Sequence, residues 1–267
     1  MTDRIWTESL GVGPVVATAI HDGHHVRESV LRQLALDDLE RLREEDPFTG
    51  GWSSVAPTRV IGLRSRFEVD LNRAREKAVY RVPEDAWGLK VWSDELAAED
   101  YEESLAEYDL FYQNLRQVLD AKVLECGRFV ILDIHTYNHR RDGADAEPAD
   151  SKANPQVNVG TGTLKERQQW APLIDRFISD LGAYDFPGSA LDVRENVKFF
   201  GGNLARWTHE NYPDSGCVLS VEFKKFFMDE WSGEPDPKLV DAIGGALGWT
   251  ASGLVESLRA LPKEPVA

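Results

Sequence analysis

Short apolar segments alternate with segments of helical periodicity along the chain. The apolar segments carry few polar residues, which is typical of strands buried on both faces of a sheet. The other segments space their apolar residues three or four positions apart, as an amphipathic helix does. The predicted strands are residues 14–20, 58–63, 128–134, 156–159 and 217–223, and the predicted helices are residues 29–44, 96–121, 164–182 and 238–261. This order predicts an α/β fold whose sheet has helices on both faces.

Histidines gather just after two of the predicted strands. His21, His24 and His25 follow the first strand, and His135 and His139 follow the third, so five of the six histidines lie in these two segments. Ligands of such folds bind beyond the carboxyl ends of the strands. Imidazole is the commonest protein ligand of metals, and a catalytic zinc site needs three protein ligands with one position left open. We therefore expect a metal site at this edge of the sheet.

The spacing leaves two alternatives for the third ligand. His24 would make a His-x-x-His pair with His21, whereas the run Glu44, Glu45 and Asp46 would supply a carboxylate at the end of the first predicted helix. An acidic run at a helix end is often only a solvated surface. Negative charge is unfavourable at a helix C-terminus, and a nearby cation would offset this cost. That argument favours the acidic run as part of a site.

Composition excludes several classes of partner. The 267 residues can bury one sizeable core without a second domain. A formal net charge of −16 argues against nucleic acid and anionic membrane surfaces, because both are polyanions. The chain has no run of about 18 apolar residues, so no membrane span is predicted. The N-terminal sequence does not resemble a signal peptide either, and we therefore expect a cytoplasmic protein. Cys126 and Cys217 lack a CxxC spacing, and we expect two buried, reduced thiols.

Positive charge is concentrated at one place in this acidic chain. Four arginines occur within residues 64–75, after the second predicted strand, together with Asn72. Arginine binds a carboxylate through two parallel N–H bonds, so this segment is a candidate site for an anionic substrate. A surface salt-bridge patch with Glu68 and Asp70 explains the composition equally well. The arginines are Arg64, Arg66, Arg73 and Arg75.

The last predicted strand contains a single acid, Glu222, within an apolar run. A buried carboxylate is unfavourable unless it is paired or functional. Next to a metal site it could take a proton from water and pass it to a leaving nitrogen. An outward-facing side chain on a half-exposed strand, or an ion pair with Lys224 or Lys225, is the alternative interpretation.

Together these segments resemble the N-formylglutamate amidohydrolase family, which is related to zinc carboxypeptidases and aspartoacylases. The resemblance runs from about His21 to Asp229 and implies one catalytic domain over residues 1–267. It implies a single-domain α/β fold with a mixed β-sheet flanked by helices, of the zinc-exopeptidase (carboxypeptidase-like) kind. The matching motifs are Ser65-Arg66, Asp70-Leu71-Asn72-Arg73, Asp133-Ile134-His135, Phe200-Gly201-Gly202, Glu222-Phe223 and Met228-Asp229.

The resemblance implies a metal centre with one Zn²⁺ per chain, or another divalent metal. His21 corresponds to the first ligand of the family and His135 to the last. Asp46 resembles the acidic ligand between them, with Glu45 as the fallback. Glu222 resembles the general base that activates the water and later acts as the acid.

The resemblance also implies where the substrate binds. Arg66, Asn72 and Arg73 are similar to the group that binds the substrate carboxylate and polarises the scissile carbonyl. Gly201 and Gly202 match a glycine pair on the substrate side. The implied substrate is a small amide that carries a carboxylate, an N-formyl or N-acyl amino acid such as N-formylglutamate.

The chain departs from the common family pattern in two places. The first loop usually reads Pro-His-Ser/Ala-Gly, whereas here Asp22 and His24 add titratable groups beside His21. The segment 138–154 carries the additional His139, two arginines and several acids. These departures affect the substrate rather than the metal chemistry. The alternatives are an aspartoacylase-like deacylase, a carboxypeptidase, or a non-catalytic protein that binds an anionic metabolite.

Overall fold

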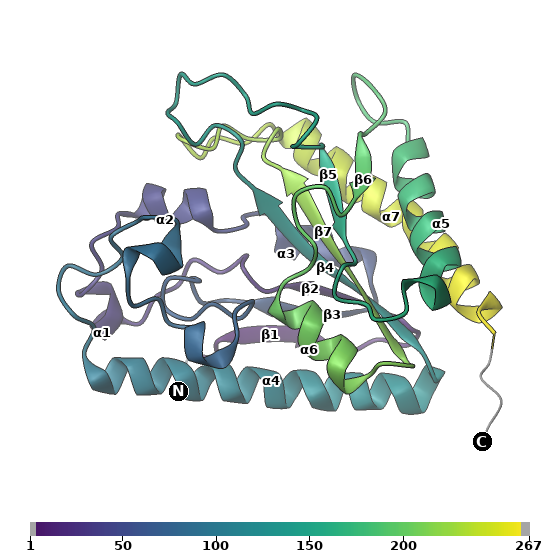
Figure 1. Ribbon diagram of the computed structural model, residues 1–267, viewed down its shortest axis with the longest axis horizontal. Helices are drawn as coiled ribbons and strands as arrows, with labels where there is room; N and C mark the ends of the chain where they lie inside the picture. The colour runs from purple at the N-terminus through teal and green to yellow at the C-terminus, as the bar shows by residue number, and fades with distance from the viewer. Residues whose placement is uncertain (1–3, 263–267) are drawn as a thin grey trace.

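Four parallel strands form the centre of a seven-stranded mixed sheet in the computed structural model, which describes residues 4–262 (Figure 1). Every residue of β2 and β4 is buried. The antiparallel pairings occur toward the edges, where β1 pairs with β3 and β5 with β7. In spatial order the strands are β1 (Trp6–Ser9), β3 (Thr58–Gly62), β2 (Val15–Ala19), β4 (Phe129–Tyr137), β7 (Gly216–Lys224), β5 (Val157–Gly160) and β6 (Val193–Glu195).

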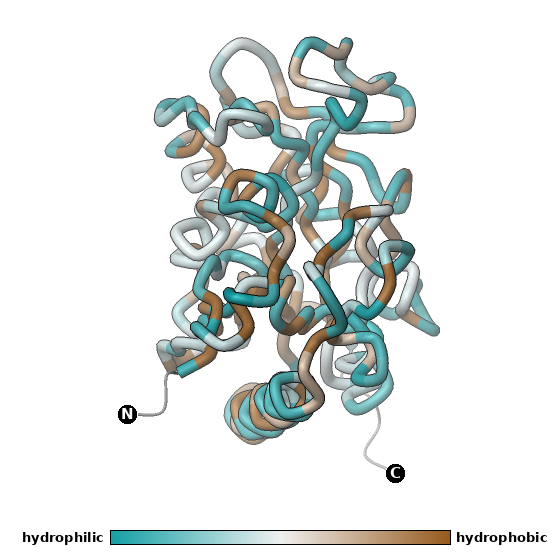
Figure 2. Tube along the Cα trace, turned by 90° about the vertical axis from the view of Figure 1, so that its left-hand side faces the viewer, coloured by the Kyte–Doolittle hydropathy of each residue, from teal (hydrophilic) through white to brown (hydrophobic). Residues whose placement is uncertain are grey.

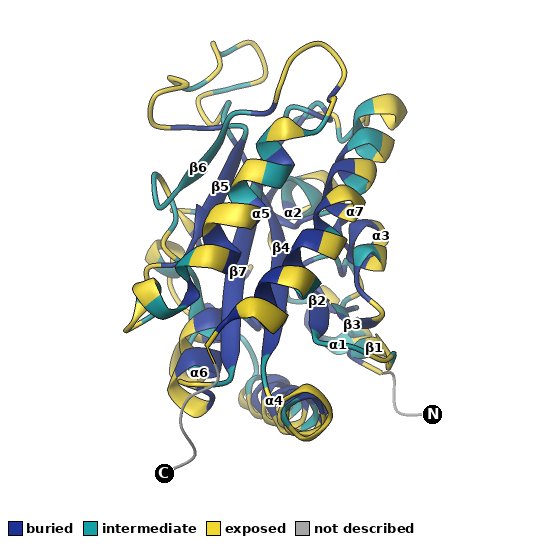
Figure 3. Ribbon diagram, turned by 90° about the vertical axis from the view of Figure 1, so that its right-hand side faces the viewer, coloured by how far each residue is buried: buried dark blue, intermediate teal, exposed yellow. Residues whose placement is uncertain are grey.

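Helices cover both faces of the sheet. The helices α3 (Thr49–Trp52), α5 (Ala171–Ala183) and α7 (Pro237–Ala260) pack on one face, where the sides of α5 and α7 that face the strands are buried and their outer sides are exposed (Figure 3). The other face is covered by α4 (Ala98–Cys126) and α6 (Asn203–Asn211). Figure 2 looks along α4, and both hydrophobic and hydrophilic residues occur around this helix. Fully apolar central strands require cover of this kind on both sides.

The alternation of side chains along β4 separates packing from chemistry. One face of the strand carries Phe129 and Ile131 and, further along, Asp133 and His135. The two apolar residues pack in the core cluster to which α4 and α6 contribute. The two polar residues follow on the same face toward the carboxyl end of the strand. A single strand therefore contributes both to the core and to a polar group at the edge of the sheet.

The predicted α/β class, with a mixed sheet between two helical layers, is confirmed, and each predicted strand forms within a few residues of its expected bounds. The helix predicted at residues 29–44 is wrong, because two short helices occur there, α1 (Glu28–Leu31) and α2 (Asp38–Glu44). Asp37 begins the second helix, since its side chain accepts a hydrogen bond from the Glu40 N–H while the Glu40 side chain accepts one from Asp37.

Other differences are smaller. The third predicted strand continues to Tyr137, so His135 lies inside β4 rather than in the loop after it. Cys126, the last residue of α4, is exposed rather than buried, whereas Cys217 is buried as expected. No helix within residues 4–262 is long and apolar enough to span a membrane. Short 3-10 turns occur at Ser53–Val55, Arg75–Lys77, Pro83–Ala86 and Arg167–Trp170.

Candidate active site

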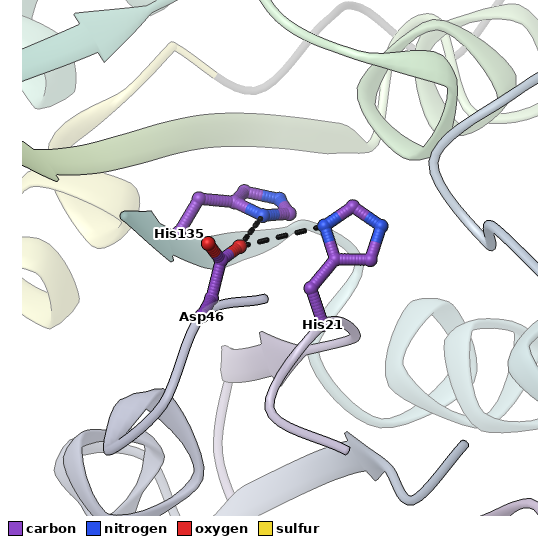
Figure 4. A group of neighbouring side chains, drawn as sticks. All are labelled: His21, Asp46 and His135. Atoms are coloured by element: carbon purple, nitrogen blue, oxygen red, sulfur yellow. Dashed lines mark hydrogen bonds and ion pairs between the residues drawn. The ribbon is translucent and has the colours of Figure 1, made fainter. Parts of the chain in front are cut away.

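Three side chains from distant parts of the chain converge at the carboxyl end of the sheet (Figure 4). His21 follows β2, Asp46 follows α2, and His135 lies in β4. Asp46 Oδ2 lies 3.4 Å from His21 Nδ1 and 3.0 Å from His135 Nδ1. All three side chains are buried, and their ligand atoms lie within 4.8 Å of one another. This is a group of donor atoms that can hold one metal ion.

A carboxylate lies behind each imidazole. His21 Nε2 lies 2.7 Å from Asp70 Oδ1, and His135 Nε2 lies 3.0 Å from Asp133 Oδ2. The hydrogen bond with Asp70 fixes the tautomer of His21 and turns its other nitrogen toward the convergent group, whereas the contact of Asp133 with His135 is an ion pair without hydrogen-bond geometry. Both Nδ1 atoms face Asp46, and His21 Nδ1 is buried without a hydrogen-bond partner among the described residues. The arrangement fits a divalent ion with two nitrogen ligands and one oxygen ligand.

The charges of the cluster keep its acid ionised. Burial acts to raise the pKa of Asp46, but its interactions with His135 and His21 outweigh this and hold the pKa well below its usual range. Burial acts to lower the pKa of His135, but the interactions with Asp133, Asp46 and Glu222 together outweigh burial and raise it. The Thr136 hydroxyl donates to Asp46 Oδ1 over 2.8 Å. The carboxylate is thus held in its charged form, which is the form that binds a metal.

Glu222 lies beside this group because of strand register. In the parallel pair of β4 and β7 it stands opposite His135. Its side chain is half-buried and borders the cavity described below. Burial raises its pKa to about 7, and the charges of Asp46 and Asp133 add to this while His135 opposes it. A carboxyl group with this pKa can accept and return a proton near neutral pH.

Lys225, an ion-pair candidate for Glu222 in the sequence, has another role in the structure. Its buried ammonium group donates to the main-chain carbonyls of Arg43 and Glu45, the latter over 2.8 Å. These carbonyls lie at the C-terminus of α2, where a cation offsets the helix dipole. Lys225 therefore fastens the end of α2 next to Asp46, a contact between positions about 180 residues apart that no local pattern indicates.

A cavity of about 510 Å³ opens onto the convergent group. Five arginines and two lysines line it, against three acids, although the whole chain carries a net charge of −16. Clefts lined by one sign of charge raise the local concentration of oppositely charged ligands. The cationic residues are Arg43, Arg66, Arg73, Lys77, Arg141, Arg206 and Lys225, and the acids are Glu44, Asp46 and Glu222.

The sequence left two interpretations for the four arginines of residues 64–75, a site for an anionic substrate and a salt-bridge patch. The structure shows two arginines in each arrangement. Arg64 lies 3.5 Å from Glu68 and takes part in a buried ion-pair cluster, and Arg75 forms a surface pair with Asp109. These two do not line the cavity. The other two, Arg66 and Arg73, do. The segment is therefore a salt-bridge patch at its two ends and a wall of the cavity between them.

Arg66 is held in place on three sides. Its guanidinium donates to Asp70 Oδ2 over 2.9 Å, to the hydroxyl of Tyr80 over 3.2 Å and to the carbonyl of Glu44 over 3.1 Å. Tyr80 also donates to Asp70. Asp70 thus connects the imidazole of His21 to a fixed positive charge in the cavity wall, a role that the sequence does not reveal.

Asn72 and the two glycines meet on another wall of the cavity. Asn72 Oδ1 accepts from the N–H of Leu204 over 3.0 Å, and Asn72 Nδ2 lies 3.4 Å from His135 Nε2. A Cβ atom at Gly202 would overlap the side chain of Asn72. Gly201 has a φ of +109°, which side chains rarely adopt. The glycine pair therefore makes room for Asn72 and borders the cavity beside it.

The additional titratable residues of the first loop lie outside the group of three. Glu45 accepts from both His24 and Ser65, so its carboxylate is already paired. Asp22 accepts from the N–H of Gly50 over 2.9 Å, and burial raises its pKa. His139 lies in the loop after β4, where burial lowers its pKa. Glu45 and Asp22 are thus paired with other residues, and Asp46 is the acid that faces the two imidazoles.

Comparison with known proteins gives one family. The family model of N-formylglutamate amidohydrolase matches residues 13–226. The fold is similar to an N-formylglutamate amidohydrolase from Ralstonia eutropha JMP134, with a TM-score of 0.74 and 15% identity over 96% of this chain and 99% of that one. The fold is also similar to a gene product of Agrobacterium tumefaciens, with a TM-score of 0.63 and 16% identity over 95% of this chain and 96% of that one. No curated protein matches the chain. The chain belongs to the N-formylglutamate amidohydrolase family, enzymes that hydrolyse a non-peptide amide bond.

Proposed function

We propose that this amidohydrolase cleaves the amide bond of an N-formyl or N-acyl amino acid, such as N-formylglutamate, with one Zn²⁺ held by His21, Asp46 and His135. The convergence of two imidazoles and one carboxylate beside a cationic cavity carries the proposal. An acid lies behind each imidazole, as in known zinc sites. We further propose that residues 1–267 form a single catalytic domain.

The protein residues supply the proton transfers. When bound, zinc would supply Lewis acidity that lowers the pKa of water from 15.7 to about 7. Glu222 accepts a proton from the attacking water and delivers it to the departing nitrogen as the C–N bond breaks. The products are a free amino acid and a small carboxylic acid, which is formate for an N-formyl substrate. The pKa of about 7 suits a group that must act as base and then as acid.

The cationic wall orients the substrate. Arg66, fixed by Asp70 and Tyr80, places a positive charge where the amide oxygen gains negative charge. Arg73 and Asn72, with Gly201 and Gly202 beside them, hold the carboxylate of the substrate.

Two substitutions separate proton transfer from metal binding. Glu222→Gln keeps the size of the side chain but cannot take a proton, so kcat should fall at least about a hundredfold with unchanged zinc content. His135→Ala should lower the zinc content measured by elemental analysis. Glu99→Gln, on the exposed start of α4, is the matched control. Near-normal turnover by Glu222→Gln, or full zinc content in His135→Ala, would contradict the proposed roles.

A panel of substrates distinguishes the proposed activity from a deacylase, a carboxypeptidase and a non-catalytic binding protein. N-formyl, N-acetyl and dipeptide forms of glutamate should be assayed side by side with the zinc-loaded protein. Preference for the formyl group supports the proposal, whereas preference for the acetyl group or for the dipeptide indicates an aspartoacylase-like deacylase or a carboxypeptidase. Tight binding of all three without product would indicate a metabolite-binding protein.

A further inference from the structure

Arg206 differs from the other arginines of the cavity in its charge partners. Five arginines line the cavity, and four of them lie within 4 Å of a carboxylate of the protein. Within residues 4–262, no carboxylate lies within that distance of Arg206, and its guanidinium makes no hydrogen bond. A guanidinium carries five N–H donors and stays charged at every physiological pH. Arg206 therefore offers the cavity a positive charge that the protein does not neutralise.

Glu44 neutralises two of the remaining arginines. Arg141 lies 3.0 Å from it, with both terminal nitrogens on its two oxygens, and Arg43 lies 3.4 Å away. These two arginines thus offer less free charge to a ligand than Arg206 does.

Asp70 partners the other two. Arg66 lies 2.9 Å from Asp70, whereas Arg73 lies 3.7 Å away and is 42% exposed. Arg73 therefore remains available for one carboxylate of the substrate, as the proposed function requires. Of the two lysines, Lys77 pairs with Asp85 over 3.1 Å, and Lys225 donates to main-chain carbonyls.

The helix that carries Arg206 is fixed at the cavity. Gly202 and Asn203 line the cavity at the start of α6, and Arg206 follows one turn later, with its N–H on the carbonyl of Gly202. Side chains of a helix lean toward its N-terminus, so the guanidinium reaches back toward the cavity. Asn203 donates to the hydroxyls of Tyr108 and Tyr112 on α4 over 3.1 and 3.0 Å. The backbone beneath Arg206 is therefore anchored.

We propose that Arg206 binds a second acidic group of the substrate, the side-chain carboxylate of an N-acylated acidic amino acid, and so selects acidic over neutral amino acids. This inference rests on the proposed function, in which Arg73 and Asn72 hold the first carboxylate. Arg206 is exposed, so solvent screens its charge, and the pair should favour the charged ligand by about three- to tenfold over its neutral analogue. The preference arises in binding, because the side-chain carboxylate does not take part in the reaction.

N-formylglutamate and N-formylglutamine test this selectivity, because they have the same shape and differ by one charge. The wild type should favour the acid in kcat/KM by about three- to tenfold, mainly through KM. Arg206→Ala should bring the ratio close to one, and Arg206→Lys should restore part of it. Arg32→Ala, at an exposed arginine outside the cavity lining, is the control and should keep the wild-type ratio.

Calorimetry with zinc-loaded Glu222→Gln repeats the comparison without turnover. Equal affinity for the two ligands, or an unchanged preference after an added Arg206→Ala, overturns the role of Arg206. A preference for the acid that disappears with Arg206→Ala supports it, even where the wild type hydrolyses neither compound. Lack of hydrolysis of both compounds by the wild type contradicts the proposed function instead, so the two failures are distinguishable.

Discussion

The substitution Asp133→Asn tests whether the imidazole of His135 depends on the acid behind it. Asp133 Oδ2 lies 3.0 Å from His135 Nε2, and Oδ1 accepts from the hydroxyl of Thr18 over 2.7 Å. Asparagine has the same size and can keep both contacts, with its oxygen on the imidazole and its amide on the hydroxyl. The change therefore removes the negative charge while it preserves the packing of two adjacent central strands.

The expected magnitude follows from the geometry. The charge of the carboxylate raises the basicity of the imidazole, and loss of such a partner weakens metal binding by about ten- to a hundredfold. This corresponds to about 1.4–2.7 kcal/mol of zinc-binding free energy. The effect should lie in metal affinity, because Asp133 is fully buried and does not line the cavity.

Competition with a chelator of known affinity measures the zinc dissociation constants. Thr18→Val is the matched control, since it has a similar shape, keeps the carboxylate and removes only the neighbouring hydrogen bond, and its zinc affinity should change by less than about threefold. Urea unfolding of the apo proteins checks that the fold is retained. Wild-type zinc affinity in Asp133→Asn, or an equal loss in Thr18→Val, would refute the role given to the charge.

Two further predictions concern the pH dependence of stability and the room that Gly202 leaves for Asn72. Burial lowers the pKa of His209 to about 4, and its Nε2 accepts from the N–H of Val218 over 2.9 Å. In the unfolded chain the pKa is about 6.5, so this stabilisation is complete above pH 6.5 and is lost as the pH falls to 4. Between pH 7 and pH 4, the free energy of unfolding measured in urea should fall by about 3 kcal/mol more in the wild type than in His209→Gln. An equal pH dependence of the two proteins would contradict this prediction. Gly202→Ala should displace Asn72 and raise KM at least about tenfold with unchanged zinc content, and an unchanged KM would show that the glycine is not needed for space.

Strand patterns indicated part of the site because strands impose regular positions. An acid in an apolar run and a histidine near the end of another run favoured a place for Glu222 and His135 at one edge of the sheet, with an outward-facing Glu222 left open as the alternative. In the structure Glu222 borders the cavity. The direct pairing of these two residues across β4 and β7 follows from register. The position of Asp46 does not follow in this way, because its N–H donates to the carbonyl of His21 and its segment is held by Lys225. The family resemblance, rather than local pattern, singled out this acid.

Two residues remained unrecognised in the sequence for different physical reasons. Asp70 has the local pattern of a salt-bridge partner, with Arg66 four positions before it, and its contact with His21 forms only when the two segments pack together. Arg206 lies on α6, which is only nine residues long, and apolar periodicity does not identify so short a helix reliably. Both roles depend on which charges meet in space, and sequence spacing does not determine those contacts.

The distribution of charge reconciles an acidic chain with the carboxylate substrate that we propose. The buried acids at the metal group are each held by a cation or an imidazole, Asp133 by His135 and Asp70 by both His21 and Arg66. Their negative charge is therefore directed toward His21 and His135, the proposed metal ligands, rather than into the cavity. The side chains that border the cavity are mainly cationic, and Arg206 has no acid beside it among the described residues. The net charge of −16 disfavours the approach of polyanions, while the local field of the cavity favours a small carboxylate of the kind proposed as substrate.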